Sequence, residues 1–187
     1  MEDITAIILA AGKGSRIGTP KLMLEINGES FLSVIINKIS SAGIKRIICV
    51  INKEVYKWSK DNFQQYEIII NPEIEKGMLS SVYYGMKEIK ETKGVMVFPV
   101  DHPFVEVETI NELFISFNNN SDSIIKPRFE SKSGHPVIIP FEILKTISEK
   151  DFDNGLNDYL IKSNCKETYV NVADKGILKN INTKEDL

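Results

Sequence analysis

The chain has 187 residues, of which 42% are hydrophobic and 26% are charged, and its formal net charge is −3 at pH 7. This length fits one domain with a full core rather than two, so we expect residues 1–187 to form a single domain. The slightly acidic balance argues against nucleic acid as a partner, because nucleic-acid binders usually carry a basic surface. No apolar run approaches the length of a membrane span, and the acidic start differs from a signal peptide. We therefore expect a cytoplasmic protein with no membrane partner.

Apolar runs and helical spacings alternate along the first two thirds of the chain. Continuous β-branched or apolar runs predict buried strands, and spacings of three and four residues predict helices between them. This alternation implies right-handed βαβ units and a mostly parallel sheet, which binds ligands at the carboxyl ends of its strands. The strands are expected at residues 6–9, 46–52, 67–71 and 94–100, and the helices at 31–39, 54–63, 79–89 and 107–117.

From residue 122 the pattern changes. Two short apolar runs around a polar turn predict paired strands, and short helical spacings follow them. The paired strands are expected at 123–128 and 136–139, the helices at 141–148 and 155–162, and two final strands at 167–172 and 176–182.

Residues 6–24 combine an apolar strand with a glycine-rich, cationic loop. Because Gly12 and Gly14 lack side chains, the backbone N–H groups of this loop can approach a ligand closely. A strand that leads into such a loop is suited to holding a polyphosphate, although an ordinary turn with solvated lysines is the alternative. Three cations within nine positions favour the polyphosphate: Lys13, Arg16 and Lys21.

The glycine spacing excludes two familiar phosphate-binding motifs. No glycine precedes Lys-Ser or Lys-Thr as in a P-loop, and Gly18 lies one position too late for G-x-G-x-x-G. The pattern L-A-A-G-x-G-x-R-x-G-x-P-K instead resembles the signature of nucleotidyltransferases that transfer NMP from an NTP. In those enzymes the loop wraps the triphosphate and its first small residues face the base. The resemblance implies that Leu9, Ala10, Ala11, Gly12 and Gly14 bind nucleotide.

Asp101 is the first candidate for metal binding. It follows a strand expected to be buried, so its carboxylate should emerge at the carboxyl edge of the sheet. Nucleotidyl transfer needs Mg²⁺ to neutralise charge, and this hard cation prefers carboxylate oxygen. The alternative for Asp-x-Pro is a simple turn. His102, beside it, is a loop residue or a substrate contact.

Two more loops carry candidate residues. Gly77 permits close approach of the backbone, and Ser80 and Ser81 can either cap a helix or meet a ribose and base edge. Gly134 and His135 lie where a new strand begins and can bring a histidine to the rim of a pocket. On local grounds alone, this last stretch is a turn with an incidental histidine.

The order of the motifs resembles that of the molybdenum-cofactor cytidylyltransferases. N-P-x(4)-G-M-x-S-S-x(3)-G, D-x-P and G-H-P-V follow the L-A-A-G loop, and the resemblance covers nearly the whole chain. It implies a Rossmann-like, three-layer α/β nucleotidyltransferase domain with a mostly parallel sheet and a mixed C-terminal part. It also implies transfer of CMP from CTP to the phosphate of molybdopterin, release of pyrophosphate, and a molybdoenzyme as a candidate client.

The same resemblance divides the roles along the chain. Residues 1–120 would bind nucleotide and residues 121–187 would bind the acceptor. Asp101 would bind Mg²⁺, Lys13 and Arg16 would hold the leaving β- and γ-phosphates, and Lys21 would stabilise charge at the α-phosphate. The acceptor-binding candidates are His102, Gly134 and His135.

The C-terminal stretch departs from the family pattern. Relatives read D-I-D-T-P-E-D-L where this chain reads N-I-N-T-K-E-D-L, and their second metal ligand lies in this region. Asn182 is therefore the candidate ligand, with an amide oxygen in place of a carboxylate.

Several alternatives stay open from the sequence. The same fold would serve guanylyl transfer to the same cofactor, or transfer to a sugar or polyol phosphate. Asn180 and Asn182 also fit a non-catalytic nucleotide-binding chaperone for a molybdoenzyme. Neither the base preference nor the oligomeric state follows from these motifs.

Overall fold

The computed structural model describes residues 3–12, 14, 18–183 and 186. Eight strands form its main sheet: β1 (Ile4–Ala10), β4 (Arg46–Ile51), β5 (Glu67–Ile70), β6 (Gly94–Pro99), β7 (Ile124–Phe129), β8 (Lys132–Ser133), β9 (Val137–Pro140) and β10 (Glu167–Asn171). Their order is β10-β7-β9-β6-β1-β4-β5, with β8 paired to β7. Strands β6, β1, β4 and β5 run parallel, as do β7 and β10, whereas β9 is antiparallel to both its neighbours. The expected mostly parallel sheet with a mixed C-terminal part is confirmed.

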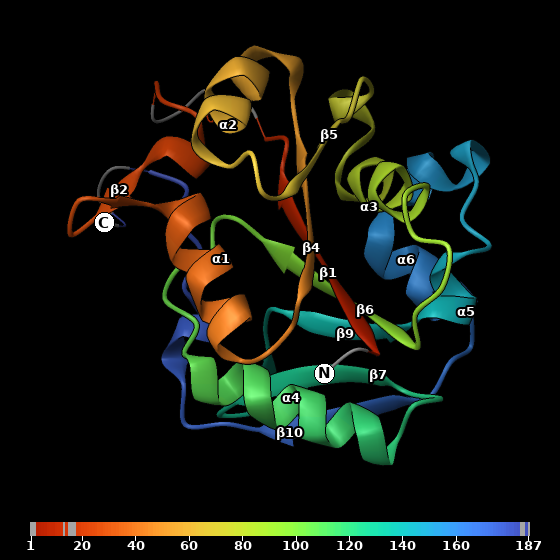
Figure 1. The fold of residues 1–187 in the computed structure, drawn as a ribbon. Helices are drawn as coiled ribbons and strands as arrows, with labels where there is room; N and C mark the ends of the chain where they lie inside the picture. Colours follow the sequence, from red (N-terminus) through yellow and green to blue (C-terminus); the bar gives the residue numbers. More distant parts are fainter. Residues whose placement is uncertain (1–2, 13, 15–17, 184–185, 187) are drawn as a thin grey trace.

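Helices cover both faces of this sheet, which gives three layers (Figure 1). They are α1 (Phe31–Ser41), α2 (Tyr56–Asn62), α3 (Met78–Met86), α4 (Val107–Asn119), α5 (Phe141–Leu144) and α6 (Gly155–Lys162). Side chains of α1, α2 and α4 pack on one face, and side chains of α3, α5 and α6 pack on the other. None of the helices in the described ranges is long and apolar enough to cross a membrane.

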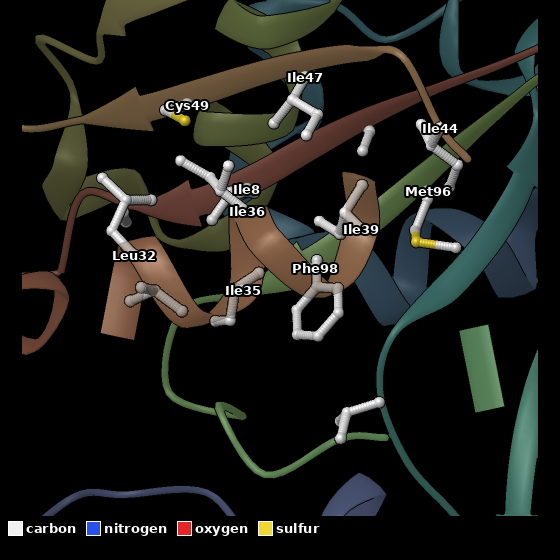
Figure 2. Packing of buried hydrophobic residues seen from close by; sticks show 14 of the residues in the cluster. Ile8, Leu32, Ile35, Ile36, Ile39, Ile44, Ile47, Cys49, Met96 and Phe98 are labelled. Carbon is white, nitrogen blue, oxygen red and sulfur yellow. The ribbon is translucent and has the colours of Figure 1, made fainter. Parts of the chain in front are cut away.

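The alternation of side chains along β1 builds both halves of the core. All seven residues of β1 are buried because the strand lies at the centre of the sheet. Ile8 faces α1, where Ile35 and Ile36 cover it, and Figure 2 shows these side chains together. Ile7 faces the opposite way and packs with Leu79 of α3. The loop that follows β1 therefore begins at a strand whose two faces are both covered by helices.

The strand predicted at 67–71 is present as β5, but the prediction that it is buried is wrong for most of its residues. It is the edge strand of the sheet, and of its four residues only Ile68 is buried. Glu67 instead pairs with Arg46 of the neighbouring β4, with 2.8 Å between Oε1 and Nε. An edge strand has a sheet neighbour on one side only, so a run of isoleucines there stays half-covered.

The prediction of a strand at 176–182 is also wrong. Residues Lys175–Leu178 form a 3₁₀ turn (η5), because the side chain of Asp174 accepts the backbone N–H of Gly176 at 2.7 Å. The backbone of this segment is then hydrogen-bonded to two loops, at His135 and at Asp101. The N–H of His135 donates to the Ile177 carbonyl at 3.1 Å, and the N–H of Ile181 donates to the Asp101 carbonyl at 2.9 Å. The end of the chain is thereby tied to the carboxyl edge of the sheet.

A small hairpin between the first loop and α1 was not predicted. It consists of β2 (Glu25–Ile26) and β3 (Glu29–Ser30), joined by Asn27 and Gly28 with φ of 54° and 84°. Asn-Gly is the preferred pair for such a turn, so this dipeptide is the signal that would have predicted the hairpin.

Candidate active site

Three side chains from distant parts of the sequence meet at one atom. Nζ of Lys21 donates to Oδ2 of Asp101 at 2.9 Å and to Oδ1 of Asn182 at 2.8 Å. The partners lie 80 and 161 residues away in sequence. Asp101 follows β6 and Lys21 begins a short 3₁₀ helix (η1, Lys21–Met23) after the first loop, so both arise at the carboxyl edge of the sheet. The site lies where parallel sheets bind their ligands.

Asn182 is held in place by its neighbours. Its own N–H and that of Thr183 both donate to Oδ2 of Asp186, at 2.9 and 2.8 Å. The preceding Ile181 donates its N–H to the carbonyl of Asp101. Because the backbone is held by hydrogen bonds on both sides of Asn182, its amide oxygen is positioned to accept from Lys21, which also donates to the Asp101 carboxylate.

The oxygen pair of Asp101 and Asn182 fits a magnesium ion. Mg²⁺ usually binds through one or two protein oxygens and completes its octahedron with water and substrate phosphates. Both oxygens accept from the same ammonium, so they converge on one point, and Asp101 and Lys21 also line a cavity. Within the described ranges, no group of three or more His, Cys, Asp and Glu side chains is placed to hold a metal.

Asp101 is held as a carboxylate. Burial raises the pKa of this carboxyl, but hydrogen bonds from His102 and Lys21 and the Lys21 charge outweigh burial and lower it to about 2. Nδ1 of His102 lies 2.9 Å from Oδ1 of Asp101. Since a carboxylate only accepts hydrogen bonds, we assign the Nδ1 proton to His102. One carboxylate oxygen thus binds His102, and the other binds Lys21.

A cavity of about 400 Å³ opens beside this cluster. It begins at the end of β1, where Asn52, which follows the neighbouring β4, donates from Nδ2 to the Ala11 carbonyl at 3.2 Å. Most of the predicted nucleotide-binding residues line it, together with the two predicted catalytic residues that the structure describes: Leu9, Ala11, Gly12, Gly77 and Ser81, with Lys21 and Asp101.

Three predicted nucleotide-binding residues do not line this cavity. Ala10 is buried in the core with α1, because alternation along β1 turns its side chain inward. Gly14 is not among the residues that line the cavity. Ser80 is fully buried, and the single proton of its hydroxyl is shared between the carbonyls of Glu73 and Gly77, at 3.0 and 2.8 Å from Oγ. Ser80 therefore holds the backbone of the loop at 73–77 by hydrogen bonds and does not itself line the cavity.

Two predicted catalytic residues, Lys13 and Arg16, lie outside the described residues. Their roles stay predictions.

Asn71 is a site residue whose role the sequence reasoning missed. Its Nδ2 donates to the hydroxyls of both Ser80 and Ser81 at 2.9 Å, and its Oδ1 accepts the N–H of Glu73 at 2.7 Å. Asn71 directly follows β5, as Asn52 follows β4. A polar residue immediately after an apolar strand is the signal that could have identified both.

The predicted acceptor-binding residues line two further cavities. One of about 480 Å³ includes Gly134, His135 and Lys126 in its wall. A smaller one of about 270 Å³ lies between the other two and is lined by His102, His135 and Asp101 among others. The rings of His102 and His135 touch edge to face, with centroids 5.0 Å apart. Burial lowers the pKa of His135 to about 4, so this imidazole is neutral near pH 7.

Replacing Gly134 by Ala is expected to destabilise the fold at this site. A Cβ at Gly134 would lie 2.2 Å from the carbonyl oxygen of Ile177, so either η5 or β8 must shift. We expect a loss of at least about 2 kcal/mol in the free energy of unfolding, measured by urea denaturation. Gly12→Ala is the matched control, because a Cβ at Gly12 meets nothing within 4 Å. Equal stability of the two variants would contradict the close approach at Gly134.

The chain matches known sequences over most of its length. Residues 6–168 match the family of the MobA-like NTP transferase domain. A protein named "Probable molybdenum cofactor guanylyltransferase" from Natranaerobius thermophilus is 25% identical over 202 residues, which cover 100% of this chain and 94% of the relative. A 2-C-methyl-D-erythritol 4-phosphate cytidylyltransferase from Dictyoglomus thermophilum is 29% identical over 133 residues, covering 67% of this chain and 56% of the relative.

The chain spans only about a third of the length of one longer relative. The bifunctional protein GlmU of Buchnera aphidicola is 28% identical over 155 residues, and the match covers 80% of this chain but 33% of GlmU.

Solved structures share the fold. A molybdopterin-guanine dinucleotide biosynthesis protein A from Archaeoglobus fulgidus superimposes with a TM-score of 0.70 at 19% identity, covering 97% of this chain and 94% of that one. Rv0371c of Mycobacterium tuberculosis, solved in complex with manganese, gives a TM-score of 0.72 at 18% identity, covering 98% and 95% of the two chains. These likenesses confirm the Rossmann-like nucleotidyltransferase fold. With 6–168 matched by the family, the chain belongs to the MobA-like NTP transferases and is an enzyme of the nucleotidyltransferase type.

Proposed function

We propose that this enzyme transfers CMP from CTP to the phosphate of a molybdopterin-type cofactor, with Mg²⁺ and with release of pyrophosphate. The observation that carries the proposal is the convergence of Lys21, Asp101 and Asn182 beside the cavity of about 400 Å³, next to the cavities that His135 lines. A donor bound in the cavity of about 400 Å³ and an acceptor bound in the cavity of about 480 Å³ would face each other across Asp101 and the smaller cavity of about 270 Å³. In this proposal residues 1–120 bind the nucleotide and residues 121–187 bind the acceptor, within one domain.

Support for the acceptor and the donor comes from different sources. The relative from Natranaerobius thermophilus, named for molybdenum cofactor guanylyl transfer, aligns with the whole chain and favours the cofactor as acceptor. The G-H-P-V and L-A-A-G motifs resemble the cytidylyltransferase branch, and the relative from Dictyoglomus thermophilum is named a cytidylyltransferase. Together they favour CTP as donor.

The proposed reaction is an in-line displacement at the α-phosphorus. An oxygen of the acceptor phosphate forms a new bond to this phosphorus, and the bond to the bridging oxygen of pyrophosphate breaks. The acceptor needs no general base, since a phosphate monoester is largely ionised near pH 7. Lys21 stabilises the charge that develops at the α-phosphate, and Asp101 and Asn182 hold Mg²⁺. When bound, Mg²⁺ neutralises charge on the triphosphate. The manganese complex of Rv0371c supports a divalent ion in this fold.

GTP is the second candidate donor. The relative that aligns with the whole chain is named a guanylyltransferase, and Asn182 stands where the cytidylyltransferase pattern has Asp. The same catalytic cluster would serve either donor, because it acts on phosphates and metal rather than on the base.

The test is pyrophosphate release with purified molybdopterin and Mg²⁺, comparing CTP and GTP, each with and without acceptor. We expect release with CTP that depends on the acceptor. Acceptor-dependent release with GTP alone would replace the donor and keep the proposed cluster. Nucleotide binding without release from either donor would refute the molybdopterin proposal. A screen of sugar and polyol phosphates would then distinguish another acceptor from a non-catalytic chaperone role.

A further inference from the structure

The three cavities of the site share one side chain, that of Met78. It lines the nucleotide cavity of about 400 Å³, the acceptor cavity of about 480 Å³ and the middle cavity of about 270 Å³ between them. Among the lining residues that the structure describes, no other belongs to all three. Asp101 lines only the nucleotide and middle cavities, and His135 lines only the acceptor and middle cavities.

The backbone before Met78 places it there. Gly77 has φ of 77° and ψ of −164°, a conformation that glycine adopts readily and other residues avoid. This turn ends the loop of η3 (Ile74–Lys76) and starts α3 directly at Met78. The next residue, Leu79, is fully buried in the core and anchors the helix. Met78 therefore projects from a fixed point into the site.

The exposure of Met78 is unusual for its chemistry. Met78 is 39% exposed, and the cavities that it lines also have the polar Asp101, Ser81 and His135 in their walls. A large apolar side chain at a polar junction does not contribute to the core. It can exclude water from the junction, and its flexible thioether can adapt to a ligand on either side.

A nucleotidyltransferase has a specific need for such exclusion. Water competes with the acceptor for the α-phosphorus. In that side reaction the water oxygen bonds to phosphorus, pyrophosphate leaves, the proton passes to solvent, and the products are NMP and pyrophosphate. An empty acceptor cavity supplies this water, so a barrier between the cavities protects the bound donor.

We propose that Met78 is the apolar partition that keeps water in the acceptor cavity from the α-phosphate and that packs against the acceptor when it binds. The inference rests on the proposed assignment of the two outer cavities to donor and acceptor. It does not depend on which base or which acceptor is used. It assigns Met78 a role in reaction specificity, beyond the metal and phosphate chemistry of Asp101 and Lys21.

The test compares Met78→Ala with Met78→Leu. Ala removes the partition, whereas Leu keeps an apolar side chain of similar volume. For Met78→Ala we expect acceptor-independent pyrophosphate release to rise roughly 10-fold, and acceptor-dependent kcat/KM to fall by on the order of 10-fold. Met78→Leu should stay within about threefold of the wild type in both, as expected for a volume-conserving swap.

Ile74→Ala is the matched control. Ile74 belongs to the same loop and lines only the nucleotide cavity among the three cavities of the site. Its loss should raise the KM for nucleotide and leave the ratio of hydrolysis to transfer unchanged. Thermal unfolding of all variants checks the fold, which should tolerate changes at the half-exposed Met78 and Ile74.

The outcomes separate the partition from the proposed function. If Met78→Ala only raises the nucleotide KM, as Ile74→Ala does, Met78 is a wall of the nucleotide cavity and the partition is overturned. Unchanged acceptor-independent release in Met78→Ala also overturns it. The hydrolysis assay contains no acceptor, so it reports on the partition even if molybdopterin proves to be the wrong acceptor.

Discussion

Asp101→Ala is expected to lower kcat for pyrophosphate release by on the order of 10³-fold at saturating Mg²⁺ and nucleotide. The pKa of this carboxyl is lowered to about 2, so Asp101 is ionised at neutral pH, and it is the charged member of the oxygen pair with Asn182. An alanine would leave one neutral amide oxygen, which binds Mg²⁺ weakly. Binding of Mn²⁺, followed by electron paramagnetic resonance, should weaken in parallel.

Asp153→Ala is the control for Asp101→Ala. Asp153 pairs with Lys76 at 3.2 Å on the surface, and its side chain is 82% exposed. Its replacement removes the same charge as Asp101→Ala does, but at a position outside the cluster. We expect unchanged kcat for this variant. Full activity of Asp101→Ala with Mg²⁺ would remove Asp101 from the proposed metal site.

Lys21→Met is expected to lower kcat by about 10²- to 10³-fold, because it removes a fixed positive charge from the position where charge develops. The Lys21 side chain is only 17% exposed, and its ammonium donates to Asp101 and Asn182, so the charge is pre-organised rather than free in solvent. The measurement is steady-state pyrophosphate release. The KM for nucleotide should change less than kcat if Lys21 acts mainly in the transition state.

Metal binding distinguishes Lys21 from Asp101. The Lys21 ammonium contacts the same two oxygens that would hold the ion, so Lys21→Met should keep or increase the affinity of the free protein for Mn²⁺. Lys179→Met is the control, since Lys179 lies over the ring of Phe104 at 3.9 Å, outside the three cavities of the site. A loss of Mn²⁺ affinity in Lys21→Met would count against separate roles for the lysine and the carboxylate.

The pattern of apolar residues along the sequence predicted most of the helices and strands, and it predicted the position of Asp101 in the site. The β-branched runs became β1, β4 and β6, and the helical spacings became α1, α3 and α4, because burial on a sheet or a helix face repeats at fixed periods. The same reasoning placed Asp101 at the carboxyl edge, beside the loop that follows β1. Parallel strands share this edge, so the order of strands and loops was enough to bring these groups near each other.

Tertiary structure decided how the two halves of the site meet. Asn182 reaches Lys21 because the preceding Ile181 donates its N–H to the Asp101 carbonyl, a contact between residues far apart in sequence. Ser80 turned inward to its loop, and Met78 came to lie between three cavities. No periodicity carries this information, because each position depends on hydrogen bonds and packing between residues far apart in sequence. The sequence by itself determined the layers and the reactive groups, and long-range contacts determined which of those groups face one another.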